Sequence, residues 1–309
     1  MKIFVLPPKE NWICDRLTNE WNSFFPEYST KNPNEADVIW LLADWCWNHL
    51  PYEILKNKKI IATVHHIVPE KFNQMEVKNF MIRDQFIDCY HVPNIHTEKL
   101  LRQLTKKRIE TIPYWLNNKL WYPEDKASAR KELGIKKEEF VIGSFQRDTE
   151  GSDLVSPKLE KGPDIFCNYI IKNIDKLSLN GSIHVLLGAW RRQYVINRLE
   201  KENIKYTFIE NASLETLRKM YASCDLYIVS SRYEGGPQAL IEAPAMKIPI
   251  ISTNVGIANN VLNKNCIIDM KNEYYMPNKE DVDYSLKKVS DLSIEKIGKK
   301  FIQLFKEIK

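Results

Sequence analysis

The sequence predicts an α/β protein of two lobes, each a parallel β-sheet wrapped by helices, with a short N-terminal lobe. Short apolar runs rich in Val and Ile alternate with segments whose apolar residues recur every three or four positions. This alternation fills the first 113 residues, and it begins again near residue 140 after a charged stretch that contains Pro123. We therefore expect an N-terminal domain over 1–120 and a C-terminal domain over 121–292, with a helix over 293–309 able to pack back on the first domain.

The first half shows strands and helices in turn. Ile13, Leu17, Trp21 and Phe25 recur at helical spacing, which predicts one buried helix face. The expected strands span 2–6, 37–42, 59–64, 89–92 and 109–113, and the expected helices span 13–25, 71–86 and 96–105. The linking stretch 114–139 contains the helix-like ASARKELG, which Gly134 can end as a C-cap.

The second half repeats this alternation. Its expected strands span 140–145, 183–188, 206–210, 225–231, 249–253 and 266–269. Its expected helices span 161–176, 191–202, 213–223, 237–246, 279–289 and 293–308. Strands that alternate with helices form parallel sheets, because each crossover helix returns the chain to the same edge of the sheet.

Glycine placement excludes two nucleotide-binding motifs. The chain has 10 glycines, and none precedes Gly134. A G-x-G-x-x-G fingerprint or a G-x-x-x-x-G-K-[ST] phosphate loop needs glycine where the backbone turns tightly against phosphate. Neither motif can therefore occur in the first 133 residues, and neither pattern occurs later.

Composition excludes several classes of protein. With 44% hydrophobic and 28% charged residues and no apolar run near the ~18 residues of a membrane span, the chain reads as an ordinary globular protein. The six cysteines include no C-x-x-C pair, so we expect neither a disulfide framework nor a zinc site. The net charge of +5 is not concentrated in either half, which argues against nucleic acid as a partner. We expect a cytoplasmic protein and leave peripheral contact with a membrane open.

The segment SSRYEGGPQALIEAPAMKIPIIST, residues 230–253, contains the densest chemical signal. A strand ends at its start, Gly235 and Gly236 follow, and Pro237 suits the first turn of a helix. Helix amides at the carboxyl edge of a parallel sheet can receive a diphosphate. Glu234 and Glu242 could then address two ends of one ligand, although two glutamates at this spacing also occur by chance in ordinary crossovers.

This segment resembles the glutamate motif of family 4 glycosyltransferases, which have the GT-B fold of two Rossmann-like domains facing across a cleft. The chain keeps the two carboxylates of the pattern, and it departs from the pattern at Gly236-Pro237 and at Lys247, where glycine is usual. The retained positions are Ser231, Glu234, Gly235, Glu242, Ala243, Ala245 and Pro249. The resemblance implies a retaining enzyme.

Other segments match the family in the same order. GSFQRDTE followed by Lys161-Gly162 resembles the element from which an Arg and a Lys reach the donor diphosphate, here Arg147 and Lys161, with a longer insertion over 148–160. TIPYWLNNKLWYP resembles the family's hinge, with Tyr114 and Trp115 in place of Asn-Gly. TVHHIVPE resembles the element whose histidine contacts the donor sugar, which implies His65, although a histidine at a strand end is often structural.

The resemblance implies a set of site residues. The expected catalytic residues are His65, Glu234, Arg147 and Lys161, and the expected donor-binding residues are Glu242, Gly235, Gly236, Pro237, Gln238, Gly188 and Ser144. Ala189-Trp190-Arg191-Arg192 replaces the rest of a glycine element after Gly188, and either arginine is a candidate phosphate contact. Trp12, Trp45, Trp47 and His66 are weaker acceptor candidates, since most tryptophans lie in cores but some stack on sugars.

The resemblance thus implies a retaining, metal-independent transfer of a sugar from a UDP- or GDP-linked donor to a carbohydrate or glycoconjugate hydroxyl. No cofactor or metal ion is expected, because the resemblance needs no cation. Two alternatives stay open. One is another nucleotide-sugar enzyme of the same fold, either an epimerase or a DNA glucosyltransferase. The other is a noncatalytic nucleotide-sugar-binding protein.

Overall fold

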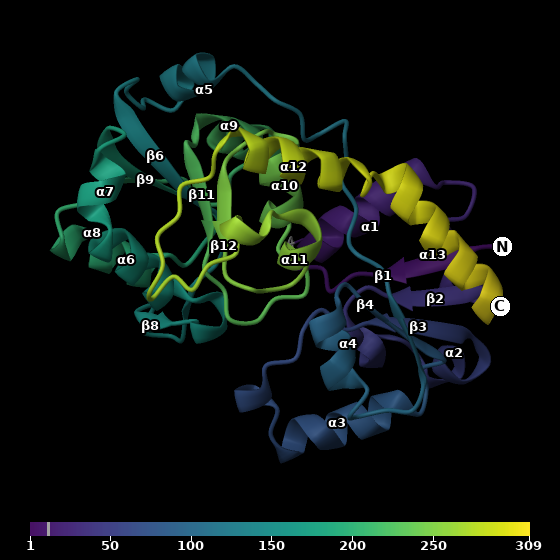
Figure 1. Ribbon diagram of the computed structural model, residues 1–309. Helices are drawn as coiled ribbons and strands as arrows, with labels where there is room; N and C mark the ends of the chain where they lie inside the picture. Colours follow the sequence, from purple (N-terminus) through teal and green to yellow (C-terminus); the bar gives the residue numbers. More distant parts are fainter. Residues whose placement is uncertain (11–12) are drawn as a thin grey trace. The chain divides into compact units, whose positions relative to one another are not determined.

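The computed structural model describes residues 1–10 and 13–309, which form two compact units (Figure 1). The N-terminal unit contains Met1–Trp115 together with Ser293–Lys309, and the C-terminal unit contains Leu116–Leu292. Each unit has a five-stranded parallel sheet. The alternating pattern predicted this architecture of two α/β lobes, each with a parallel sheet.

The strands of the N-terminal unit pair in chain order. They are β1 (Ile3–Leu6), β2 (Val38–Leu41), β3 (Lys59–Thr63), β4 (Cys89–Val92) and β5 (Arg108–Thr111). Their order is β1-β2-β3-β4-β5, and each pair of neighbours is parallel. Since this order never reverses, the described sheet has no switch point of the kind at which open α/β sheets bind ligands.

Helices cover both faces of this sheet, and the second strand, β2, is therefore buried on both sides. Ile39 and Leu41 belong to the same core cluster as Phe80 and Leu101 from the helices of one face. Trp40 points to the other face and lies 4.6 Å, between ring centroids, from Phe301. The first face carries α2 (Tyr52–Asn57), α3 (Gln74–Asp84) and α4 (Ile95–Leu101), and the second carries α1 (Ile13–Phe24) and α13 (Ile294–Ile308). Figure 1 shows α13 beside β1 and β2, on the side away from α3.

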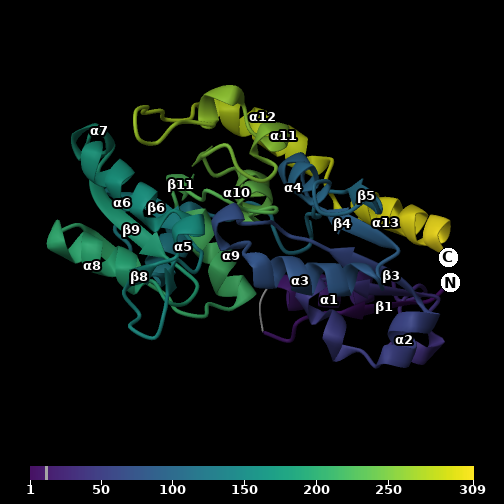
Figure 2. The ribbon, with the colours of Figure 1, turned by 90° about the horizontal axis from the view of Figure 1, so that it is seen from below.

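The last helix of the chain, α13, packs into the N-terminal unit. A Cβ on Gly298 would lie 2.1 Å from the ring of Phe25, so the helix approaches this ring closely only because residue 298 is glycine. The carboxylate of Glu307 accepts a hydrogen bond from Arg108 of β5 at 2.5 Å. Figure 2, a view from below, shows the two chain ends close together at the edge of this unit.

The strand order of the C-terminal unit reverses at its first strand. The strands are β6 (Glu139–Ser144), β9 (Ser182–Leu187), β10 (Lys205–Phe208), β11 (Leu226–Val229) and β12 (Ile250–Ser252). The order β10-β9-β6-β11-β12 means that the chain builds outward from β6 first to one edge and then to the other. In such doubly wound sheets, ligands bind outside the carboxyl ends of the strands at the point of reversal, here between β6 and β11.

Three helices of this unit begin at a residue whose side chain caps the first turn. Asp125, Ser213 and Asn278 each accept a hydrogen bond from a first-turn amide, and Asn278 forms a capping box with Asp281. The helices are α5 (Lys126–Glu132), α6 (Pro163–Lys172), α7 (Ile174–Ser178), α8 (Gln193–Lys201), α9 (Leu214–Ser223), α10 (Ala239–Ala245), α11 (Ala258–Val261) and α12 (Lys279–Ser290).

Three expected elements differ from the structure. The strand expected over 266–269 makes one isolated bridge, between Ile267 and Ser252, and Asp269 instead organises a turn through its side chain. The helix expected over 161–176 divides into α6 and α7, because Asn173 leaves helical geometry and its side chain bonds the carbonyl of Tyr169. The insertion 148–160 contains a short hairpin of β7 (Thr149–Glu150) and β8 (Ser156–Pro157).

The sequence analysis also missed several short elements. Residues around 44–57 form η2 (Asp44–His49) and then α2, and single 3-10 turns occur elsewhere in the chain. These turns are η1 (Pro33–Glu35), η3 (Pro69–Lys71), η4 (Leu159–Lys161) and η5 (Lys264–Cys266). Within the described residues, no helix has both the length and the apolar character needed to cross a membrane.

Candidate functional site

The Lys161-Gly162 pair lies against the end of β11, at the reversal of the C-terminal sheet. Gly162 has φ +63, and a Cβ there would lie 1.9 Å from the carbonyl oxygen of Ser230. The carbonyl of Lys161 accepts hydrogen bonds from the amide of Gln146 at 2.9 Å and from Ser231 at 3.4 Å. Only glycine allows this close approach, so the two predicted motifs, 161–162 and 230–253, meet at the expected crevice.

The side chains of Lys161 and Glu234 form an ion pair. The distance from Nζ to Oε1 is 2.5 Å, and both side chains are largely buried. The hydroxyl of Ser231 donates to the same carboxylate oxygen at 3.2 Å and to Gln146 at 3.3 Å. Two of the expected catalytic residues are therefore held together, on loops that follow β11 and precede α6.

Glu242, which the resemblance placed on the donor ribose, lies inside α10 and is only 3% exposed. Its Oε2 accepts a hydrogen bond from the hydroxyl of Tyr221 at 2.9 Å. Burial and the neighbouring carboxylate raise the pKa of Tyr221 well above its usual value, so this phenol stays protonated and donates. The sequence analysis missed Tyr221 because nothing local connects α9 to α10.

The segment before α10 differs from the helix expected over 237–246. The helix begins at Ala239 with Gln238 as its N-cap, so Pro237 lies before the first turn rather than in it. The carbonyl of Pro237 accepts from the amide of Leu240, and that of Gln238 accepts from Ile241 and Glu242. Gly235 and Gly236 precede this turn, and their contact with a donor stays a prediction.

Arg147, the expected diphosphate contact, lies in the loop after β6. Its guanidinium carbon is 4.7 Å from the ring centroid of Trp190, and its Nε donates to the carbonyl of Thr149 at 3.3 Å. Arg191 lies over the same indole at 4.7 Å. The sequence analysis noted Trp190 only as a departure from the family's glycine element, and that departure was the available signal.

Arg192 is fully buried, so it is not the phosphate contact that the sequence left open. Its Nε is 2.6 Å from Oδ2 of Asp148, which is 1% exposed. Its other nitrogens donate to the carbonyls of Ser144 and Gly188, and at 3.1 Å to the Ser144 hydroxyl. Ser144 and Gly188, both expected donor contacts, therefore hold this arginine and join the ends of β6 and β9.

His65, the expected sugar contact, has both ring nitrogens engaged inside the N-terminal unit. Nε2 donates to the carbonyl of Leu42 at 2.8 Å, and Nδ1 is hydrogen-bonded to the hydroxyl of Tyr114. Because a carbonyl oxygen can only accept, Nε2 carries a proton. Cys14 Sγ lies 3.4 Å from Nε2, and burial raises the pKa of this thiol to about 12, so it stays protonated. Contact of His65 with a sugar stays a prediction.

The acceptor candidates have different surroundings. Trp45 is 49% exposed, and its ring centroid lies 5.6 Å from that of His65. Trp47 instead stacks on Phe86 at 5.7 Å and packs against the core. His66 is half-buried directly after His65. The candidate Trp12 lies outside the described residues.

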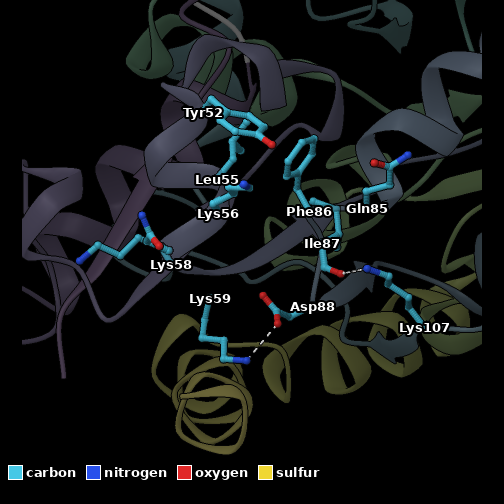
Figure 3. Close-up of a pocket in the computed structure, with 11 residues that line it drawn as sticks. Tyr52, Leu55, Lys56, Lys58, Lys59, Gln85, Phe86, Ile87, Asp88 and Lys107 are labelled. Carbon is cyan, nitrogen blue, oxygen red and sulfur yellow. Dashed lines mark hydrogen bonds and ion pairs between the residues drawn. The ribbon is translucent and has the colours of Figure 1, made fainter.

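A separate cavity of about 450 Å³ opens on the N-terminal unit (Figure 3). It lies where β3 and β4 begin, whereas His65 follows the end of β3. Two of its lysines are already bound to protein groups. Lys59 pairs with Asp88 at 3.1 Å, and Lys107 donates to the carbonyl of Ile87 (Figure 3). These lysines join neighbouring segments of the chain, and the cavity contains none of the expected site residues.

Among the described residues, no group of three or more His, Cys, Asp or Glu side chains could hold a metal ion.

Comparison with known proteins agrees with the fold and matches a family model over part of the chain. Residues 159–301 match the family model described as "Glycosyl transferases group 1". The matched segment contains Lys161, Glu234 and Glu242 and begins after Arg147. This match covers less than half of the chain, and with the relatives below it shows a likeness to glycosyltransferases.

Two characterised relatives have names in that class. The chain is 26% identical over 281 residues to a glycogen synthase of Fervidobacterium nodosum, covering 81% of this chain and 55% of the relative. It is 24% identical over 225 residues to the O-antigen chain mannosyltransferase RfbU of Salmonella typhimurium, covering 67% and 59%. The chain thus spans little more than half the length of either relative.

Solved structures of low identity share the fold. The chain resembles Anabaena HepE, solved in complex with UDP and glucose, with a TM-score of 0.74 and 12% identity over 99% of this chain and 100% of that one. Sucrose-phosphate synthase of Thermosynechococcus elongatus gives a TM-score of 0.68 and 18% identity over 98% and 80%. These likenesses confirm the expected GT-B fold class.

Proposed function

We propose that this protein transfers a sugar from a nucleoside-diphosphate donor to a carbohydrate or glycoconjugate hydroxyl. The observation that carries this proposal is the pairing of Lys161 with Glu234 at 2.5 Å, where the strand order of the C-terminal sheet reverses. It brings a cation for the diphosphate next to a carboxylate that can accept hydrogen bonds from sugar hydroxyls. The group 1 match over residues 159–301 and the names of the relatives support this reading.

The cationic side chains suit the charge that develops during such a transfer. The bond between the anomeric carbon and the phosphate oxygen breaks, and the leaving nucleoside diphosphate gains negative charge. Fixed cations such as Lys161 and Arg147 stabilise that charge more in the transition state than in the ground state. For this reason we propose that transfer needs no metal ion and no cofactor. The proposed donor is a UDP- or GDP-linked hexose.

We further propose that the product keeps the anomeric configuration of the donor. The acceptor hydroxyl attacks on the face that the phosphate leaves, a new bond from the anomeric carbon to the acceptor oxygen forms, and the leaving phosphate oxygen takes the acceptor proton. In the C-terminal unit Glu242, held by Tyr221, is the proposed partner of the ribose. In the N-terminal unit His65 and Trp45 are the proposed contacts for the sugar and the acceptor.

Incubation of the chain with UDP-, GDP- and ADP-sugars and carbohydrate acceptors tests the proposal, with nucleotide release as the signal. We expect release with one donor class, unchanged by a chelator, and a product whose anomeric proton coupling matches the donor. Glu242→Ala should weaken donor binding, whereas Glu202→Ala, an exposed glutamate of the same unit, should not. Nucleotide binding without release from any donor would instead identify a noncatalytic binding protein.

A further inference from the structure

The indole of Trp190 contacts two arginines at the carboxyl edge of the C-terminal sheet. The guanidinium carbons of Arg147 and Arg191 are each 4.7 Å from its ring centroid. Arg147 comes from the loop after β6 and Trp190 from the loop after β9. These loops are neighbours because Ser144 pairs with Leu187 at the aligned ends of the two strands.

The backbone that follows Arg147 is fixed by buried contacts. Asp148 is bound by the buried Arg192, and Thr149, which is also fully buried, donates its amide to the carbonyl of Arg191 at 3.0 Å. The Thr149 hydroxyl also accepts from the amide of Tyr194 at 3.1 Å. Hydrogen bonds therefore hold the two loops together. The motion that remains is rotation of the long Arg147 side chain.

The face of the Trp190 ring restricts the rotation of the Arg147 side chain. A guanidinium over the face of a tryptophan is attracted by the negative face of the ring, more strongly where water is excluded. Ordering the side chain in advance also removes part of the entropy that binding would otherwise cost. A diphosphate carries more than one negative charge, so it can pair with more than one guanidinium.

We propose that Trp190 is a positioning residue for a diphosphate. It holds the guanidinium of Arg147, with Arg191 beside it, so that two cations face the phosphates of the ligand. This inference rests on the proposed function for the identity of the ligand, a nucleoside-diphosphate sugar. It assigns a role to the segment in which this chain departs from the family's glycine element, and it selects Arg191 from the two arginines that the sequence left as candidates.

Calorimetric titration with inorganic pyrophosphate tests this inference without the sugar or the base. We expect Trp190→Leu to weaken pyrophosphate binding about 3- to 30-fold, and Trp190→Phe, which keeps a ring, to weaken it less than about threefold. The effect of Trp190→Leu should disappear in an Arg147→Gln, Arg191→Gln background, because no guanidinium is left to hold. Tyr284→Leu, which removes the ring 5.3 Å from the Lys288 ammonium in α12, serves as the control and should change nothing.

Two results would overturn the inference. One is pyrophosphate affinity that does not change in Trp190→Leu, or that is absent from the wild-type chain. The other is an equal loss of affinity in the presence and absence of the two arginines, which would mean that the ring only supports the loops. The proposed function fails separately: pyrophosphate binding that depends on Trp190, with no turnover of any donor sugar, would contradict sugar transfer and leave the role of Trp190 intact.

Discussion

The ammonium of Lys161 and the carboxylate of Glu234 are separated by 73 residues along the chain and by 2.5 Å in the structure. Lys161 ends η4, before α6, and Glu234 follows β11. The pair forms where the chain, having started at β6, has built one half of the sheet and begins the other. An open sheet of this order brings loops from its two halves together at this point.

Lys161→Met should lower kcat/KM for the donor on the order of 10²–10³-fold, because it removes a fixed cation from the position where charge develops. The loss should appear mainly in kcat. Steady-state nucleotide release measures both parameters. Lys126→Met, which breaks the ion pair with Asp225 at 3.0 Å in the same unit, is the matched control. An equal loss in both variants would show that only general stability had changed.

Gly162→Ala should destabilise the C-terminal unit well beyond the cost of a positive φ. That backbone cost is about 1–2 kcal/mol, and here the new Cβ would also lie 1.9 Å from the Ser230 carbonyl oxygen. Gly134→Ala is the control, since Gly134 has φ +67 and no heavy atom within 4 Å of the added Cβ. Urea unfolding of both variants compares them, and equal free-energy losses would refute the close approach.

Asp148→Asn and Arg192→Met should each destabilise the C-terminal unit by about 3–5 kcal/mol, because each leaves a buried group without its charged partner. Burial raises the pKa of Asp148 and the charge of Arg192 opposes that rise, so the carboxylate depends on the arginine. The double variant Asp148→Leu, Arg192→Met should lose less than the sum of the single variants. Thermal unfolding of the three variants and the wild type completes a double-mutant cycle. Losses of unfolding free energy that simply add would contradict the pairing of Asp148 with Arg192.

The stability of the N-terminal unit should fall as the pH drops from about 6.5 to 4. Burial lowers the pKa of His91 to about 4, whereas an unfolded chain binds the proton near the usual value of about 6.5. Between these values the unfolded state binds more protons, so acid favours unfolding, and above pH 6.5 the contribution is complete. The shift corresponds to about 3 kcal/mol.

Hydrogen exchange of the β4 amides across this pH range measures the effect. His91→Gln should flatten the pH dependence, and His96→Gln, at an exposed histidine of α4, should leave it unchanged. Because the His91 Nε2 donates to the carbonyl of Ile112 at 2.8 Å, the variant is also expected to be less stable at pH 7. A pH dependence identical in wild type and His91→Gln would assign the effect to other groups.

Much of the fold could be predicted from local patterns. The strand expected over 59–64 is β3, ending at Thr63, and the helix expected over 279–289 is α12, ending at Ser290. The strand expected over 266–269 makes only one bridge to β12, because the Asp269 side chain turns the chain away, and an apolar run does not reveal that turn. The helix expected over 161–176 splits at Asn173. This split depends on a hydrogen bond from the Asn173 side chain to the backbone, which apolar spacing does not reveal.

The sequence by itself determined which segments alternate between strand and helix, and where the residues of the glutamate motif occur. Only the tertiary structure decided which residues meet. It buried Arg192 against Asp148, joined Tyr114 to His65, and placed Trp190 beneath Arg147. The physical reason is that periodicity reports which face of an element is buried, whereas contacts between distant segments depend on strand order and register. Those two properties arise from packing the whole sheet, and no single segment of the chain encodes them.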